Sequence, residues 1–195
     1  MEIDRDKIYQ LDKYTFQNFT TLDADTIEKI RLWRNHPDIR KYMYNPNEIT
    51  ELEHQNFINS LKDRRDKSYW LVSRNDTPLG VINLVDIDYE VSMAELGYYL
   101  IQDYHKTGIV IEFLVTVHFF FFEMINISTI YGGTNIKNID AQLLNKFLGG
   151  EEKGLFTKDN NQYLRHFITK EHFLALRHKT DNFRTFVTFL KETSH

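Results

Sequence analysis

Ala94-Glu-Leu-Gly-Tyr-Tyr-Leu-Ile-Gln-Asp-Tyr-His-Lys-Thr-Gly-Ile-Val110 predicts a strand, then a short loop with one glycine, then the start of a long apolar helix. A loop that enters a helix presents unpaired backbone N–H groups and the positive end of the helix dipole. His105, Lys106 and Gly108 lie in this loop, where the glycine tolerates positive φ and the lysine adds a positive charge. The stretch therefore predicts a binding site for a phosphate or diphosphate group.

The residues that follow predict a further strand and helix. The apolar helix is expected from about Ile109 to Met124, and its run Phe119–Phe122 indicates burial against a sheet. A strand over Thr129–Thr134 comes next, and Gly132-Gly133 inside it indicates a bulge or a close approach of a ligand or backbone. A short helix, Asn138–Leu148, then ends at two glycines.

The rest of the chain adds strands and helices that complete an α+β pattern. Loose apolar alternation predicts a first strand within Lys7–Thr20, and Asp25 or Thr26 offers an N-cap to a helix over Ile27–Asn35. The other expected elements are a helix opened by the capping box Thr50-Glu-Leu-Glu53 and ending near Leu61, strands Tyr69–Arg74 and Val81–Asp88 joined by a turn at Asn75–Gly80, strands Met93–Ile101 and Tyr163–Thr169, and a helix within Glu171–Lys191. This order predicts a mixed, mostly antiparallel central sheet flanked by helices on both faces.

Length and composition exclude several classes of function. A chain of 195 residues without a linker-like segment is expected to form a single domain over 1–195. The formal net charge of −4 offers no basic face for nucleic acid, and the apolar runs are too short to span a membrane. The chain has no cysteine, which suits a reducing cytoplasm, and its eight histidines lack metal-ligand spacing. We therefore expect a cytoplasmic protein with no metal, nucleic-acid partner or membrane association.

The order of strand, glycine loop, long helix and strand resembles the GNAT acetyltransferases. In that family the loop amides hold the pyrophosphate of acetyl-CoA, and two central strands splay apart so that pantetheine bonds a strand edge. The resemblance places the splay near Gly132-Gly133 and the edge amides at Tyr98 to Leu100. It implies that acetyl-CoA contacts the following loop residues, of which only the glycine matches the family pattern strictly: His105, Lys106, Thr107, Gly108, Ile109 and Val110.

Further matches are similar to the branch of the family that acetylates a nucleotide-linked 4-amino sugar in pseudaminic acid biosynthesis. They are Leu32–Pro37, Met43-Tyr44, Glu95–Leu100 and the helix from Asn138 to Gly149. The chain from about residue 170 to 195 looks like a C-terminal extension beyond that branch. The expected partner is a small-molecule amine acceptor, and a homodimer is left open. A polyamine or protein N-terminal acceptor, or a non-catalytic acyl-CoA-binding module, are the alternatives.

Three groups of residues are candidates for the acceptor cleft and the chemistry. Arg34 and Asn35 follow a helix and are expected to bind the acceptor, although a helix C-cap explains them equally. Asp86 is a candidate for a cationic acceptor, with a solvated strand end as the alternative. Glu95 is expected to be the base that accepts the amine proton, and a salt-bridged or solvent-facing strand residue is its structural alternative.

The departing thiolate needs a proton, and the residue at the family's usual proton-donor position differs in this chain. The family motif Asn-x-x-Ala/Ser-x-x-x-Tyr maps onto Asn138 and Ala141, with Asn145 at the tyrosine position. An amide cannot release a proton near neutral pH, so Asn145 is expected only to donate a hydrogen bond to the sulfur. Water or a phenol, Tyr98 or Tyr99, must then supply the proton.

Overall fold

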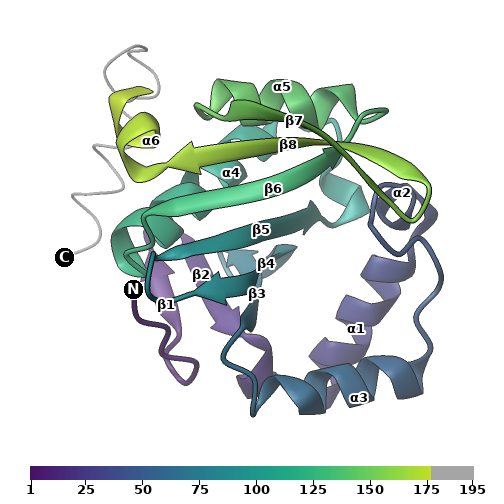
Figure 1. The fold of residues 1–195 in the computed structure, drawn as a ribbon. Helices are drawn as coiled ribbons and strands as arrows, with labels where there is room; N and C mark the ends of the chain where they lie inside the picture. The colour runs from purple at the N-terminus through teal and green to yellow at the C-terminus, as the bar shows by residue number, and fades with distance from the viewer. Residues whose placement is uncertain (177–195) are drawn as a thin grey trace.

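The computed structural model describes residues 1–176, which form one eight-stranded sheet and six α-helices (Figure 1). The strands are β1 Tyr9–Leu11, β2 Tyr14–Asn18, β3 Lys67–Arg74, β4 Thr77–Asp88, β5 Met93–Leu100, β6 Thr129–Asn135, β7 Glu151–Lys158 and β8 Asn161–Thr169. The helices are α1 Ala24–Asn35, α2 Pro37–Arg40, α3 Glu51–Leu61, α4 Ile109–Phe119, α5 Ile139–Phe147 and α6 Lys170–Leu176. The strand order is β1-β2-β3-β4-β5-β6-β8-β7, and only β5 and β6 pair in parallel. The predicted α+β class is therefore confirmed.

The N-terminal segment differs from its prediction. The single strand expected within Lys7–Thr20 is a hairpin of β1 and β2, because Asp12 adopts a φ of 52° that permits a tight turn. Helix α1 also begins earlier than expected. Its N-cap is Asp23, whose carboxylate accepts from the backbone N–H of Thr26, rather than Asp25 or Thr26.

The structure confirms the capping box and the hairpin that the sequence predicts between Thr50 and Asp88. Thr50 and Glu53 form both hydrogen bonds of the predicted capping box at the start of α3. The β3–β4 hairpin is present, but its turn is only Asn75 and Asp76, both at positive φ. Strand β4 therefore starts at Thr77 and not at Val81.

Two apolar clusters cover the two faces of the sheet. On one face, α4 and the π-helical turn Phe120–Met124 after it pack against alternate strand residues such as Trp70, Ile82 and Ala94. On the other face, the helices α1 and α3 cover Leu71 and Val81. The Phe119–Phe122 run is buried in the first cluster, as predicted.

The sequence does not predict strand β7, because it is an edge strand with almost every residue exposed and so has no apolar alternation. The helix expected within Glu171–Lys191 is described only as far as Leu176, where α6 ends, and the rest lies outside the described residues. Helix α5 lies within the predicted range, with Asn138 as its N-cap and Leu148 as its C-cap, and Gly149 follows at a φ of 86°.

The central feature of the sheet is a gap between its two parallel strands. β5 and β6 pair only from Met93 to Glu95, opposite Thr129 to Tyr131, and then separate (Figure 1). Gly132-Gly133 follows directly, so the splay lies where the resemblance placed it. This separation leaves the end of β5 with a partner on its β4 side only, among the pairings that the structure describes.

Candidate active site

A cavity of about 460 Å³ passes through the gap between β5 and β6. Its lining comes from both faces of the sheet: Arg34 and His54 belong to the side of α1 and α3, whereas Ala141 and Asn145 belong to α5. Residues Glu95 to Tyr99 of β5 lie between them. Two molecules that enter from opposite faces can therefore meet in the gap.

Glu95 lies on the α1 and α3 side of this cavity and is hydrogen-bonded to Tyr44. The Tyr44 hydroxyl donates to Oε1 of Glu95 over 2.6 Å. Burial and this contact with the carboxylate raise the pKa of Tyr44, so the phenol stays protonated and remains the donor. Glu95 therefore has a hydrogen-bonded partner inside the cavity and no ion-pair partner among the described residues.

The two glycines of β6 make room for side chains on opposite faces. A Cβ on Gly132 would lie 3.1 Å from the ring of His166, and a Cβ on Gly133 would clash with the Tyr44 hydroxyl. The pairing of β6 with β8 is regular through both glycines. There is therefore no bulge. Backbone does approach Gly132, since a Cβ there would lie 3.3 Å from the Leu96 carbonyl oxygen, but the other close groups are side chains, which the sequence does not predict.

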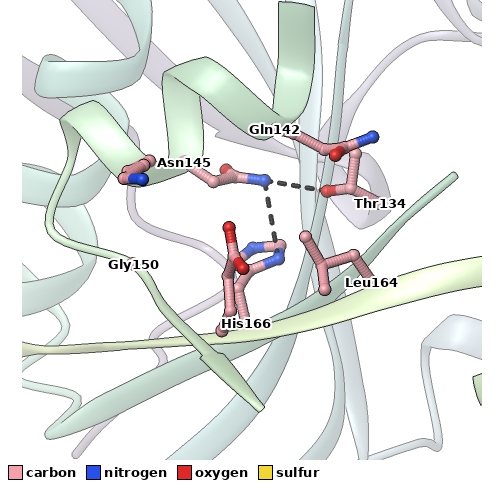
Figure 2. A pocket seen from close by; sticks show the side chains of 8 residues that line it. Thr134, Gln142, Asn145, Gly150, Leu164 and His166 are labelled. Carbon is pink, nitrogen blue, oxygen red and sulfur yellow. Dashed lines mark hydrogen bonds between the residues drawn. The ribbon is translucent and has the colours of Figure 1, made fainter. Parts of the chain in front are cut away.

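Asn145 is tied into a polar network on the α5 side (Figure 2). Its Nδ2 donates to the Thr134 hydroxyl over 2.8 Å and lies 3.5 Å from Nδ1 of His166. Burial lowers the pKa of His166 to about 4, so its imidazole is neutral at neutral pH. The same residues line a pocket of about 10 Å³, which has room for about one water molecule. The Asn145 amide protons are thus directed at protein groups, which weakens the expected hydrogen bond to sulfur.

The two tyrosines considered as acids have different surroundings. Tyr98 faces Phe113 of α4, and burial raises its pKa to about 12. Tyr99 lies on the opposite face, where its hydroxyl donates to the Ile30 carbonyl over 3.4 Å. Burial raises the pKa of Tyr99 as well. Both line the cavity, but their pKa values make each a weak acid at neutral pH.

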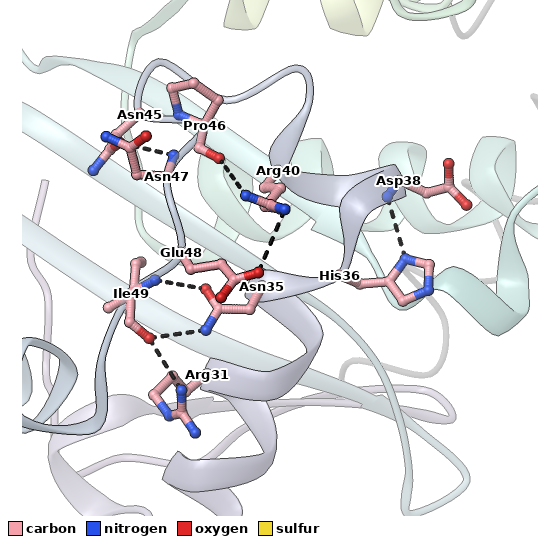
Figure 3. Close-up of polar contacts among 10 residues, drawn as sticks. All are labelled: Arg31, Asn35, His36, Asp38, Arg40, Asn45, Pro46, Asn47, Glu48 and Ile49. Carbon is pink, nitrogen blue, oxygen red and sulfur yellow. Dashed lines mark hydrogen bonds and ion pairs between the residues drawn. The ribbon is translucent and has the colours of Figure 1, made fainter.

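The predicted acceptor residues do not all reach the cavity. Arg34 lines it and donates from Nη2 to the Asn45 carbonyl over 2.6 Å, while its buried Nη1 has no hydrogen-bond partner among the described residues. Burial lowers the pKa of this guanidinium, which nevertheless stays charged. Asn35 instead exchanges two 2.8 Å hydrogen bonds with the Ile49 backbone and fixes the loop before α3 (Figure 3). Asn35 is the last residue of α1 and His36 is the C-cap, so the predicted C-cap role of Asn35 is not observed. Its side chain holds the loop at Ile49 and is not among the residues that line the cavity.

Asp86 is exposed on β4, at a φ of 51° and within the register shift between Val85 and Asp88. It is not among the residues that line the cavity. The solvated strand end, which was the alternative interpretation, fits this position.

The glycine loop lies on the surface at the N-terminus of α4. Gly108 is the N-cap, with a φ of 79° and no side-chain capping bond, and a Cβ at this position would have no atom within 4 Å. His105 donates from Nε2 to the Leu100 carbonyl over 3.1 Å and thereby ties the loop to β5. Residues 105–108 are exposed, and Ile109 and Val110 are half-buried. The helix N-terminus is therefore open to an anionic ligand, as the sequence predicts.

Three features of this fold together define an acyltransferase: the split pair of parallel strands, the glycine loop before α4, and the cavity in the gap between the strands. The comparison with known families assigns the chain to the same class. The acetyltransferase (GNAT) domain family matches residues 13–151, and the chain belongs to this family of acetyl-CoA-dependent N-acetyltransferases. No helix in the described part of the chain is long and apolar enough to cross a membrane.

Individual relatives agree with the family assignment. The chain is 33% identical over 114 residues to acetyltransferase PseH of Campylobacter jejuni serotype O:2, a match that covers 58% of this chain and 69% of that protein. Its fold is similar to a spermidine N-acetyltransferase of Vibrio cholerae in complex with CoA and spermine, with a TM-score of 0.72 at 18% identity, over 83% of this chain and 98% of the other. The crystal structure of Campylobacter jejuni PseH has a TM-score of 0.61 at 23% identity, over 80% and 98%.

Three residues of the site have no role predicted from the sequence. Tyr44 lies in a matched dipeptide, Met43-Tyr44, but nothing in the local sequence relates it to Glu95, 51 residues away. Thr134 is predicted only as a strand residue. His166 lies in β8, beyond the segment that carries the resemblance, and its register opposite Gly132 has no signal in the sequence.

Proposed function

We propose that the chain transfers an acetyl group from acetyl-CoA to the primary amine of a nucleotide-linked 4-amino sugar. The observation that carries the proposal is the cavity through the β5–β6 gap, lined by Glu95 on one face and by α5 on the other. The donor would enter from the side of α4 and α5, and the acceptor from the side of α1 and α3. The two reacting groups would meet beside Glu95.

The donor side rests on the loop and the strand edge. The open N-terminus of α4 at Gly108 would take the diphosphate through backbone N–H groups, with Lys106 adding charge. The end of β5, Tyr98 to Leu100, would bond the pantetheine arm along the edge that β6 leaves open. A backbone N–H near Leu100 would polarise the thioester carbonyl.

The chemistry requires one proton to leave the amine and one to reach the sulfur. The amine nitrogen forms a bond to the acetyl carbon as the carbon–sulfur bond breaks, and Glu95 accepts the nitrogen's proton directly or through water. Because a thiol has a pKa of about 8.5, its thiolate is a good leaving group that needs little acid assistance. Water is the proton source that we favour, since Asn145 is an amide and Tyr98 and Tyr99 have raised pKa values.

The acceptor class rests on Arg34. A guanidinium whose Nη1 is buried and unpartnered in residues 1–176 is suited to an anionic or carbonyl oxygen of a ligand. A nucleotide-linked sugar carries such anionic oxygens, whereas a polyamine would bring more positive charge to this arginine. The fold-level likeness to a spermidine acetyltransferase keeps the polyamine as the second candidate.

An acetyl-transfer assay on the full chain tests the proposal. Thiol release from acetyl-CoA would be compared for a nucleotide-linked 4-amino sugar, spermidine and a peptide with a primary N-terminal amine. We expect the highest kcat/KM with the sugar, and a rate lower by roughly 10²–10⁴-fold for Glu95→Gln. Glu90→Gln, an exposed carboxylate outside the cavity lining, is the matched control.

Each other outcome contradicts a defined part of the proposal. Preference for spermidine would replace the sugar with a polyamine. Tight binding of CoA without turnover of any amine would make the chain a non-catalytic acyl-CoA-binding module. Full turnover by Glu95→Gln would remove Glu95 from the reaction.

A further inference from the structure

We propose that Tyr44 is a positioning residue for Glu95, and that residue 133 is a glycine because this contact needs the space. The inference rests on the proposed role of Glu95 as the base. It adds a residue from the loop after α2, which is distant in sequence from β5 and β6.

The contact itself is short and directional. The Tyr44 hydroxyl donates to Oε1 of Glu95 over 2.6 Å, a distance typical of a hydrogen bond to an ionised carboxylate. Fixing Oε1 in this way restricts rotation of the carboxylate and presents Oε2 for the proton of the incoming amine. Since base catalysis depends on the geometry of the proton acceptor, a loose carboxylate would lower the rate without removing the base.

Tyr44 is held by aromatic and cationic side chains of the β7–β8 hairpin. Its ring meets that of Tyr163 edge-on at a centroid distance of 4.8 Å, and that of Phe156 at 6.5 Å. Lys158 Nζ lies 3.9 Å from the Tyr44 ring centroid. These contacts fix the ring, so the hydroxyl has little freedom to leave the carboxylate.

Gly133 supplies the space that this arrangement requires. A Cβ at residue 133 would clash with the Tyr44 hydroxyl oxygen and would lie 2.5 Å from Cζ of Phe156, closer than real Cβ atoms approach. The backbone of Gly133 is not at positive φ, so conformation does not explain the glycine. Any side chain here would displace Tyr44, Phe156 or both.

A double-mutant cycle separates positioning from a general structural effect. Tyr44→Phe keeps the ring and removes the hydroxyl, so we expect kcat to fall by about 10- to 100-fold with the KM for acetyl-CoA unchanged. In the Glu95→Gln background the same substitution should change kcat less than about 2-fold, because there is no base left to position. Gly133→Ala should lower kcat in the same way as Tyr44→Phe. Tyr89→Phe, an exposed tyrosine whose hydroxyl donates to the Arg65 carbonyl, is the control for hydroxyl loss.

Two results would overturn the inference. One is an equal loss of kcat from Tyr44→Phe with and without Glu95, which would indicate a structural role only. The other is a crystal structure of Tyr44→Phe in which the Glu95 carboxylate keeps its position. That structure also separates this inference from the proposed function, because it can show displacement of Glu95 even if Glu95→Gln turns over normally.

Discussion

At the scale of single residues, the proposed choice of acceptor depends on Arg34. Its Nη2 is bonded to the loop before α3, while its buried Nη1 has no partner among the described residues. Leaving a charged donor without a partner costs free energy, and a ligand oxygen would recover it.

We predict that Arg34→Gln raises the KM for the nucleotide-linked acceptor by about 10- to 100-fold, the equivalent of a hydrogen bond to a charged group. The affinity for CoA, measured by titration calorimetry, should not change. Arg40→Gln is the matched control, because Arg40 contacts Pro46 and Glu48 of the same loop but does not line the cavity. An acceptor KM equal to that of the parent enzyme would contradict the proposed contact.

At the scale of elements, the proposed donor site lies at the turn from β5 into α4. Gly108 stands at a φ of 79°, with open space beside it, at the N-terminus of α4. Asp and Asn both tolerate this conformation better than other side chains and both can cap a helix, but only Asp adds negative charge.

We therefore expect Gly108→Asp to weaken CoA binding by more than about 10-fold in titration calorimetry, since a carboxylate would repel and displace the diphosphate. Gly108→Asn has nearly the same shape without the charge and should bind CoA more tightly than Gly108→Asp. Equal affinities of the two variants would argue against an anion site in this loop.

The elements that could be predicted are those with local signals. The capping box at Thr50, the β3–β4 hairpin and the glycine-ended helix α5 each depend on a few adjacent residues. The first strand was mispredicted because Asp12 at positive φ turns the chain within an apolar run. Strand β7 has no apolar alternation because it lies at the exposed edge of the sheet.

In the candidate site too, residues with a local sequence signal could be predicted and contacts between distant segments could not. Glu95 and the loop at Gly108 could be selected because they lie in one continuous stretch around the strand and helix. The contact of Tyr44 with Glu95 and that of Asn145 with Thr134 and His166 depend on how distant segments pack. No period or motif in a single sequence indicates such contacts, and the same is true of the hydrogen bond between Asn35 and the Ile49 carbonyl.

At the scale of the whole molecule, α4 carries a core histidine that is expected to make stability depend on pH. His118 is fully buried, donates from Nδ1 to the Leu114 carbonyl over 2.7 Å, and has an unpartnered Nε2 among the described residues. Burial lowers its pKa from 6.5 to about 4. The unfolded chain therefore binds this proton near pH 6.5, whereas the folded chain does so only near pH 4.

Above about pH 6.5, His118 is neutral in both the folded and the unfolded chain and does not lower the free energy of unfolding. As the pH falls toward 4, the unfolded chain takes up a proton at this residue first, and the free energy of unfolding falls by roughly 3 kcal/mol in total. We predict that His118→Leu has a free energy of unfolding that falls less steeply between about pH 7 and 4.5 than that of the parent protein. Denaturant titrations at a series of pH values measure both slopes. Parallel curves for the two proteins would show that His118 titrates alike in the folded and unfolded chains.

The central claim is that donor and acceptor meet in the gap between β5 and β6, and a crystal structure of the protein with CoA tests it most directly. We predict that the diphosphate is bound by backbone N–H groups of residues 105–110, that pantetheine follows the edge of β5, and that the sulfur lies in the cavity beside Glu95. A CoA molecule whose pantetheine arm stays outside the gap, or whose diphosphate binds away from the N-terminus of α4, would contradict the account.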